Sequence, residues 1–236
     1  KSISLELHKG EILSLLGENG SGKTTLMNML SGIYYPDEGQ IFVDGKEVDI
    51  RSPKDAFDLH IGMIHQHFKL VDVFTAAENI ILGLPGDKGK MDKNAVAKAV
   101  REIADRYGFD IDPNQKIYEM SVSQKQTVEI VKVLYRGADI LILDEPTAVL
   151  TPQETEKLFT VMRNMKKDGK AIIIITHKLH EVLAVSDRVA VLRKGEYIGD
   201  TDTATASQQS LTDMMVGRAV SLNIDRPLNE NQTERL

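Results

Sequence analysis

The sequence predicts an α/β fold with a mixed sheet, and three observations support this prediction. Short apolar runs without alternation are typical of strands buried on both faces, and each is followed by a stretch compatible with a helix. Two pairs of short strands with tight turns interrupt that pattern. A central stretch has the periodicity of packed helices. We therefore expect a parallel core, antiparallel β hairpins and an inserted α-helical lobe.

The strands are predicted from composition and from turn chemistry. The continuous apolar runs lie at Ile12–Leu16, 140–143 and 171–175. One hairpin is expected at 41–48, where Asp-Gly suits a type I′ turn, and another at 189–198 around a Lys-Gly turn. The sheet should therefore contain an antiparallel part beside the parallel one.

The stretch from about residue 75 to 135 is expected to form the helical lobe. Asp92 is the expected N-cap of its first helix and Gly108 the expected end. A polar loop at 83–90 should tie the lobe to the core. Ala95, Ala99, Ile103 and Tyr107 are predicted to share one face of the first helix, and a second helix is predicted to run through Val128, Val131 and Tyr135.

Composition excludes several classes of protein. The net charge of −6 argues against a protein that coats nucleic acid, which requires a strong positive field. The absence of cysteine excludes disulfides and thiolate-bound zinc. We expect no membrane-spanning segment, because no apolar run approaches the roughly 20 residues that cross a bilayer. No signal-peptide pattern is expected either.

Residues 17–24 fit the pattern G-x-x-x-x-G-K-[ST], the P-loop, between a buried strand and an expected helix at 24–30. Glycines let backbone amides turn toward phosphate oxygens, and the helix N-terminus adds partial positive charge. Lys23 is expected to reach the β- and γ-phosphates, and Thr24 to bind Mg²⁺. The alternative is a glycine-rich turn with a solvated lysine. The predicted phosphate-binding residues are Gly17, Glu18, Asn19, Gly20, Ser21, Gly22, Lys23, Thr24 and Thr25.

A pair of acids follows the apolar run at 140–143, at the end of a strand where open parallel sheets bind ligands. Asp144 suits direct or indirect binding of Mg²⁺ in a P-loop NTPase core. Glu145 should point elsewhere, toward an attacking water that it orients and deprotonates. The alternative is that the two acids simply leave the strand for solvent.

The order of these motifs resembles the nucleotide-binding domain of an ATP-binding-cassette (ABC) protein over roughly residues 1–220. Within that superfamily the chain is similar to the ATPases of simple-sugar and nucleoside importers. The resemblance is carried by residues 17–24, 61–68, 135–152 and 214–218. It implies an ATPase domain over 1–222, with the core at 1–68 and 136–200, the helical lobe at about 69–135, a C-terminal segment at 201–222 and a linker or tail at 223–236.

The resemblance assigns roles to further residues. Gln66 matches the loop between core and lobe that contacts Mg²⁺ and the attacking water and faces the permease. His177 matches the switch histidine at the γ-phosphate. Ser121, Ser123 and Gln124 match the signature segment, which caps the ATP held by the opposite domain. A small residue at the start of a helix suits that role, because amide donors then face a phosphate.

The sequence departs from the family pattern at several positions. Ser123 stands where glycine is usual and Thr127 where arginine is usual, and a side chain at Ser123 would obstruct a close contact between backbone and phosphate. Thr151 replaces an aspartate found in many relatives. The segment with the adenine-stacking aromatic is expected upstream of Lys1. A weakened composite site is therefore expected.

The function expected from the resemblance is ATP hydrolysis that drives uptake of a nucleoside or simple sugar. Lys23, Gln66, Glu145 and His177 are the predicted catalytic residues, and Thr24, Gln66 and Asp144 the predicted Mg²⁺ ligands. The expected partners are a second ATPase domain (a tandem half or a homodimer), permease subunits at the cytoplasmic face of the membrane and, indirectly, a solute-binding protein. The alternatives are a regulatory half-site with little turnover and a soluble ABC ATPase without a permease.

Overall fold

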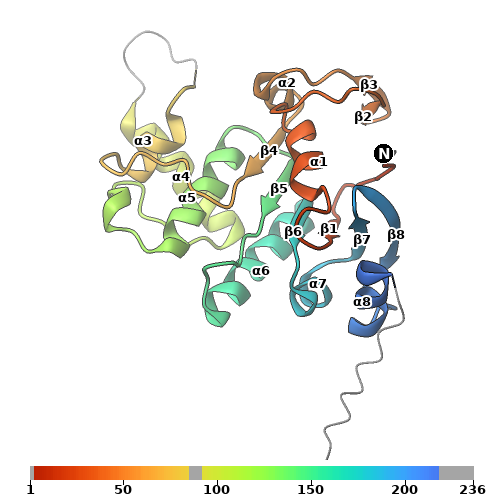
Figure 1. The fold of residues 1–236 in the computed structure, drawn as a ribbon. Helices are drawn as coiled ribbons and strands as arrows, with labels where there is room; N and C mark the ends of the chain where they lie inside the picture. The colour runs from red at the N-terminus through yellow and green to blue at the C-terminus, as the bar shows by residue number, and fades with distance from the viewer. Residues whose placement is uncertain (1–2, 85–91, 218–236) are drawn as a thin grey trace, which may run out of the picture.

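The computed structural model describes residues 3–84 and 92–217, which form a sheet covered by helices on both faces, with a group of helices at one side (Figure 1). The main sheet has six strands in the order β4-β5-β6-β1-β7-β8, and β2 and β3 form a separate two-stranded sheet. Five strands of the main sheet run parallel and β8 runs antiparallel to β7. The predicted α/β class with a mixed sheet is confirmed.

The strands are short and, in the centre of the sheet, completely buried. Their bounds are β1 Ile12–Leu16, β2 Ile41–Val43, β3 Lys46–Val48, β4 Ile61–Ile64, β5 Ile140–Asp144, β6 Ala171–Thr176, β7 Arg188–Arg193 and β8 Glu196–Asp202. Every residue of β1 and β6 is buried, as expected for continuous apolar runs covered on both faces.

The helices begin mostly at capping residues and end at glycines or short turns. Their bounds are α1 Lys23–Leu30, α2 Pro53–Asp58, α3 Ala76–Ile81, α4 Lys93–Tyr107, the 3₁₀ turn η1 Ile117–Glu119, α5 Val122–Tyr135, α6 Pro152–Lys167, α7 Leu179–Val185 and α8 Gln208–Val216. In the described part of the chain, none of these helices combines the length and the apolar character that crossing a bilayer requires.

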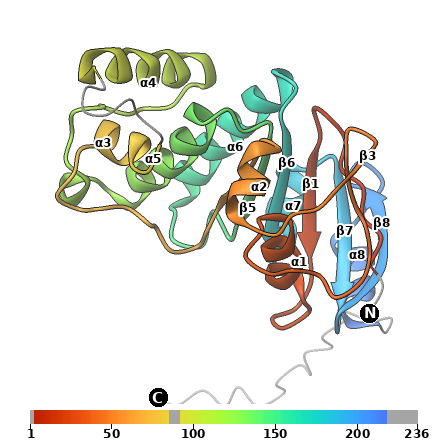
Figure 2. The same cartoon turned by 90° about the horizontal axis from the view of Figure 1, so that it is seen from above.

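Helices lie on both sides of the sheet (Figure 2), and alternate residues of the strands divide the core into two layers. Leu13, Ile142 and Ile173 face α1, α2 and the β2–β3 hairpin. The neighbouring residues Leu141 and Ile172 face α5 and α6. Beyond β1, the second face is closed by α7 and α8, which pack on β7. Burial on both faces explains why helices must flank the sheet on each side.

The helices α3, α4 and α5 surround a hydrophobic cluster of their own, beside the sheet (Figure 1). Val100 and Ile80 are fully buried there, together with Val128 and Val131 from α5. On its other face, α5 contributes Ile130 to the cluster that covers β5 and β6. Helix α5 therefore belongs to both hydrophobic units.

The face of α4 predicted from Ala95, Ala99, Ile103 and Tyr107 is confirmed at its C-terminal end, where Tyr107 is buried and Ile103 packs against the core, and it is wrong at its N-terminal end. Ala95 is exposed and Ala99 only half-buried, whereas Val96, Val100 and Ala104 are buried. A strict spacing of four residues advances 400° around a helix and drifts by about 40° at each step, whereas mixed spacings of three and four stay on one face. The predicted N-cap Asp92 and the left-handed Gly108 at the C-cap are both confirmed.

The predicted strands and hairpins are confirmed with small extensions. β5 extends to Asp144 and β6 to Thr176. The β7–β8 hairpin joins the main sheet, whereas the β2–β3 hairpin stands apart from it. β4 had no strand prediction, since its run of four residues contains Gly62. The loop predicted at 83–90 falls mostly, and the tail predicted at 223–236 entirely, outside the described residues.

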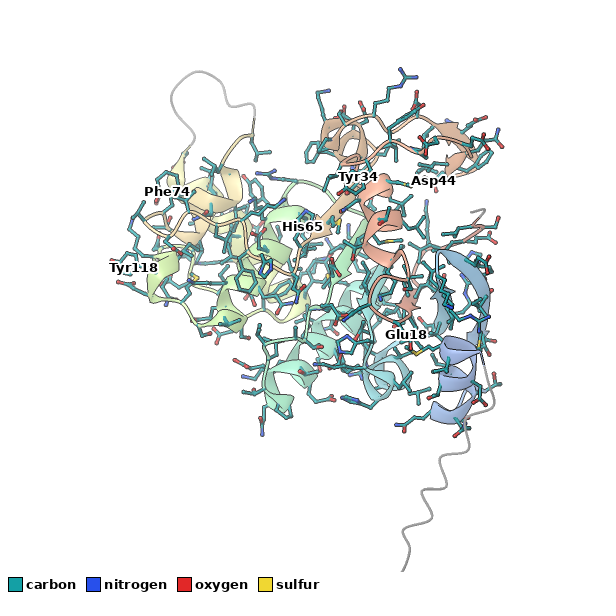
Figure 3. All side chains as sticks on the ribbon, viewed as in Figure 1. Glu18, Tyr34, Asp44, His65, Phe74 and Tyr118 are labelled. Atoms are coloured by element: carbon teal, nitrogen blue, oxygen red, sulfur yellow. The ribbon has the colours of Figure 1, made fainter. Side chains whose placement is uncertain are left out.

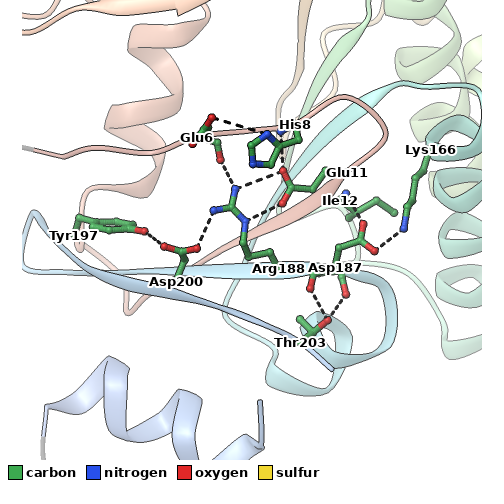
Figure 4. A network of polar contacts seen from close by, with 11 residues as sticks. Glu6, His8, Glu11, Ile12, Lys166, Asp187, Arg188, Tyr197, Asp200 and Thr203 are labelled. Atoms are coloured by element: carbon green, nitrogen blue, oxygen red, sulfur yellow. Dashed lines mark hydrogen bonds and ion pairs between the residues drawn. The ribbon is translucent and has the colours of Figure 1, made fainter. Parts of the chain in front are cut away.

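A polar network fastens the amino-terminal ends of β1 and β7 at the edge of the sheet (Figure 4). Arg188 donates from Nε to Glu11 Oε1 and from Nη1 to Asp200 Oδ2, both at 2.8 Å. Arg188 also donates to the Glu6 carbonyl, and the Tyr197 hydroxyl donates to Asp200. These bonds lower the pKa of Asp200, with the Tyr197 hydroxyl as the first cause and Arg188 as the second.

We expect Asp200→Asn to lower the free energy of unfolding by about 1 kcal/mol at neutral pH, after allowance for solvent screening of a partly exposed pair. A carboxyl whose folded pKa is depressed stabilises the fold above its unfolded pKa, near 4, and loses that contribution as the pH falls through the folded pKa. The difference between wild type and variant should therefore shrink below about pH 4. Urea unfolding between pH 2.5 and 7 measures it.

Asp105→Asn, at an exposed position on α4, is the matched control and should leave unfolding unchanged. An Asp200→Asn effect that is constant over the whole pH range would contradict the assignment to the carboxylate charge.

Candidate functional site

The parallel register brings four strand ends to one edge of the sheet. Leu16 pairs with Thr176, and Asp144 pairs with Ile175. Ile64 of β4 pairs with Leu143, one residue before Asp144. The segments that follow these strands carry the P-loop, the acid pair, His177 and Gln66. The residues that the sequence predicted for the core half of the site therefore converge at the carboxyl edge of the sheet.

The P-loop turns tightly between β1 and α1. Lys23 Nζ donates to the carbonyls of Gly17 at 2.7 Å and Glu18 at 3.0 Å, so its side chain folds back across the turn. Gly22 precedes α1 in a left-handed conformation with φ +98°, which an L side chain adopts only with strain. The first amides of α1 therefore open toward the concave side of the loop.

The β7–β8 turn supports the P-loop from behind. The amide of Gly195 donates to the Ser21 carbonyl at 3.0 Å. A Cβ on Gly17 would lie 2.4 Å from the Leu192 carbonyl oxygen and 2.5 Å from Ser21 Oγ, so no larger residue fits there without a shift of the backbone. Hence the Lys-Gly turn of the second hairpin has a structural role in the site that its sequence did not reveal.

The exposure of the loop residues divides them into a base and a rim. Lys23 is 6% exposed and Ser21 is 4% exposed. The rim residues are exposed: Glu18, Asn19, Gly20, Thr24 and Thr25. Burial lowers the pKa of Lys23, and the charges of Glu145 and Asp144 oppose that shift. The loop therefore presents an enclosed cation beneath an open ring of backbone and hydroxyl groups.

The acid pair leaves β5 beside the P-loop. Burial raises the pKa of Asp144, the charge of Glu145 raises it further, and Lys23 opposes both. Glu145 has φ +47°, and its Oε1 lies 2.9 Å from Nδ1 of His177, which follows β6. Its side chain is only 14% exposed, whereas that of His177 is 55% exposed. The left-handed backbone turns Glu145 away from Asp144 and toward the histidine.

Two buried oxygens at this edge lack protein partners. Within residues 3–84 and 92–217, Ser21 Oγ and Glu145 Oε2 are buried without a hydrogen-bond partner. Buried polar atoms are normally satisfied, and unsatisfied ones at a cluster of charges indicate room for a polar ligand. Hydroxyl and carboxylate oxygens from Thr24 and Asp144 are the donor types that Mg²⁺ prefers. The side chains present therefore fit a phosphate chain with its metal ion.

Gln66 lies two residues beyond β4 and is exposed. Its position follows from the pairing of β4 with β5, which sets the two strand ends side by side. Figure 3 shows His65, the preceding residue, between the helical group and the core. Burial lowers the pKa of His65, and the charge of Lys69 adds to that shift. The assignment of Gln66 to the loop between core and lobe stays a prediction, which its place directly after β4 allows.

The predicted signature residues do not join this edge. Ser121 caps α5: its Oγ accepts from the Gln124 amide at 3.2 Å, while Gln124 Oε1 accepts from the Ser121 amide at 2.9 Å. Ser123 is half-buried in the first turn. Tyr118, just before this turn, and Glu18 of the P-loop lie on different sides of the molecule (Figure 3). One chain therefore holds the two halves of the predicted site apart.

A buried polar cluster lies beneath the acid pair and was not predicted. Thr147 is 1% exposed and its hydroxyl donates to Glu181 Oε2 at 2.5 Å. Lys178 Nζ donates to the Thr147 carbonyl at 3.0 Å and pairs with Glu181 Oε1 at 3.0 Å. Glu181 stands four residues after His177, on the first turn of α7. This spacing of four residues was the signal in the sequence from which Glu181 could have been predicted to belong near the site. Thr151, at the end of the same loop, caps α6 in a capping box.

A family model described as "ABC transporter" matches residues 1–148. The chain belongs to the ABC transporter family. Curated relatives include the "Nucleoside import ATP-binding protein NupA" of Lactococcus lactis, 54% identical over 93% of this chain and 44% of that protein. The "Guanosine import ATP-binding protein NupO" of Bacillus subtilis is 53% identical over 95% of this chain and 44% of that protein. The chain thus spans less than half of these relatives.

Solved ABC structures have the same fold. The structure of cbiO1 from Clostridium perfringens, part of the ABC transporter complex cbiONQ, has a TM-score of 0.74 and 31% identity, and covers 86% of this chain and 81% of that one. The dimeric bacterial ABC transporter cassette MJ0796 has a TM-score of 0.72 and 26% identity, over 86% of this chain and 90% of that one. The predicted family resemblance is confirmed.

We expect Gly17→Ala to destabilise the fold by about 3 kcal/mol, because the added Cβ meets a backbone carbonyl at a buried turn. Gly20→Ala is the matched comparison, since its Cβ has open space and only the positive φ is strained, at about 1 kcal/mol. Urea unfolding of both variants measures the difference. Equal losses at the two positions would contradict the close packing of the P-loop on β7.

Proposed function

We propose that the chain binds and hydrolyses ATP, and that hydrolysis powers the uptake of a small solute, a nucleoside or a simple sugar, through a membrane permease. The observation that carries the proposal is the convergence of Lys23, Asp144 and the Glu145–His177 pair at one edge of the sheet. The similarity to import ATP-binding proteins supports it independently.

The chemistry follows from the charges at that edge. Lys23 and the amides of the P-loop bind phosphate oxygens and stabilise the charge of the transferred group. Glu145, fixed against His177 through Oε1, keeps its second oxygen to orient an attacking water and accept its proton. Gln66 is proposed to orient the same water. Thr24, Asp144 and Gln66 would hold Mg²⁺, which neutralises phosphate charge when bound.

A second ATPase domain completes the proposed site. Ser121, Ser123 and Gln124 lie at the start of α5, just after Tyr118, which is on a different side of the molecule from Glu18 of the P-loop (Figure 3). The proposal therefore pairs them with the P-loop of a partner domain. The dimeric MJ0796 cassette provides a precedent for such pairing. The partner is either a second copy or a tandem half of a longer polypeptide.

The proposed location is the cytoplasmic face of the membrane, where the domain binds permease subunits as a peripheral protein and acts indirectly on a solute-binding protein. The relatives named as import ATP-binding proteins support this location. Closure of two domains around ATP would change the permease, since closure and release are coupled to the nucleotide state.

Glu145→Gln should preserve ATP binding and reduce the turnover number by two to four orders of magnitude, roughly the contribution of a general base. Lys23→Ala should weaken ATP binding by about tenfold or more, because a charge-assisted contact to phosphate is lost. A fluorescent ATP analogue measures binding, and phosphate release by the assembled transporter measures turnover.

Asp105→Asn on α4 serves as the control and should change neither quantity. Full turnover by the Glu145→Gln protein with its partner domain present would reject the role of the carboxylate. Unchanged binding by Lys23→Ala would reject the P-loop assignment.

One observation favours the second candidate, a regulatory half-site with little turnover. Ser123 stands in the first turn of α5, where a close backbone contact to the partner's nucleotide is expected. Under this alternative, Ser123→Gly should raise the turnover of the composite site by about tenfold, since the side chain that obstructs the approach is removed. Single-turnover hydrolysis in the assembled transporter decides between the two, and unchanged turnover would dismiss the alternative.

A further inference from the structure

Two buried polar side chains of α5 have no role in the chemistry described so far. Gln126 is 6% exposed and Glu129 is 8% exposed. They are three residues apart, so they point from the same side of the helix. An amide and a carboxyl are unfavourable in a hydrophobic environment unless each is hydrogen-bonded. The hydrogen-bond partners of Gln126 and Glu129 therefore show which segments these two side chains hold in place.

Gln126 holds the segment that carries the catalytic carboxylate. Its Nε2 donates to the Pro146 carbonyl at 2.7 Å, and Pro146 directly follows Glu145. Glu145 is in the left-handed region, which is strained for a residue with a side chain. Because the Pro146 carbonyl is held, the backbone is restrained one residue beyond this strained position. The direction of the Glu145 side chain therefore depends in part on α5.

Glu129 holds the segment that follows Gln66. Its Oε1 accepts from the Lys69 amide at 2.7 Å, and its Oε2 lies 3.9 Å from Lys132 Nζ. A hydrogen bond to a charged acceptor is stronger than one between neutral groups. Lys69 is three residues beyond Gln66, so this bond limits where the Gln66 segment can lie.

Packing keeps α5 in a fixed relation to the sheet at the same place. A Cβ on Gly62 of β4 would lie 2.8 Å from Val133 Cβ, so α5 approaches the strand as closely as a glycine permits. Ile130 packs in the cluster over β5, while Val128 and Val131 pack in the helical group. A shift of either loop would therefore be transmitted to the whole helix, whose first turn carries Ser121.

We propose that Gln126 and Glu129 are positioning residues that couple the two nucleotide-facing loops of one domain to the orientation of its own signature turn. This inference rests on the proposed function, since it assumes that Glu145 and Gln66 respond to ATP. Through these two bonds, ATP at the P-loop orders residues 121–126, which face the partner's nucleotide.

The test uses the full-length protein assembled with its permease. The double variant Gln126→Met with Glu129→Leu removes both bonds with little change in side-chain volume. Glu129→Gln retains an acceptor for the Lys69 amide and is the conservative variant. Asn164→Ala is the matched control, because Asn164 also donates from a side chain to a backbone carbonyl, that of Tyr107, at 2.9 Å, and joins α6 to α4 away from the nucleotide edge.

Hydrogen exchange of peptides covering 66–70 and 121–126 is measured by mass spectrometry with and without a non-hydrolysable ATP analogue. In wild type we expect the analogue to slow exchange at 121–126. In the double variant this response should be lost, and the Lys69 amide should exchange faster.

The affinity of the double variant for ATP should change less than about twofold while its turnover number falls about tenfold, as expected when catalytic groups are misplaced. Glu129→Gln and Asn164→Ala should both keep the wild-type response.

A double variant that keeps the nucleotide response at 121–126 would overturn the inference, and so would an Asn164→Ala protein that loses it equally. Equal losses of affinity and turnover would also overturn it, since they indicate general destabilisation. The exchange response needs only ATP binding. A wild-type protein that shows the response without hydrolysis would therefore contradict the proposed function and still support the coupling.

Discussion

The in-register parallel pairing of β4, β5, β6 and β1 is the constraint on which the candidate site depends. The hydrogen-bond ladders fix where each strand ends, and burial on both faces prevents a slip of one residue, which would turn every side chain to the opposite layer. The P-loop, Glu145, His177 and Gln66 all follow these ends. Their convergence is thus a consequence of the sheet, and the loops themselves add only local geometry.

The site has a high local concentration of charge in a partly buried setting. Lys23 is nearly buried and loses part of its basicity, while Asp144 has its pKa raised by burial and by Glu145. Such an arrangement is unfavourable for charged groups without partners, and in the proposed function the charges of phosphate and Mg²⁺ would offset that cost. Ser21 Oγ and Glu145 Oε2, which are buried without a hydrogen-bond partner among the described residues, are consistent with a polar ligand in the proposed function.

Helix α5 connects the sheet with the helical group. It packs on the sheet through Ile130 and on the helical group through Val131, and it begins at the capped Ser121. Tyr118, just before the turn at Ser121, lies on a different side of the molecule from Glu18 of the P-loop. The proposed pairing with a partner domain rests on that separation.

Every strand except β4, together with the P-loop and the acid pair, could be predicted from the sequence, because continuous apolar runs, turn residues and the G-x-x-x-x-G-K-T pattern are local signals. The sequence also predicted the caps Asp92 and Gly108, since capping depends on nearby backbone groups. Packing between distant segments fixes which face of α4 is buried and how Leu192 and the turn after it support Gly17. It also brings Gln126 and Glu129 to the loops after Glu145 and Gln66. These features join residues that are distant in the chain, and no local pattern records such contacts.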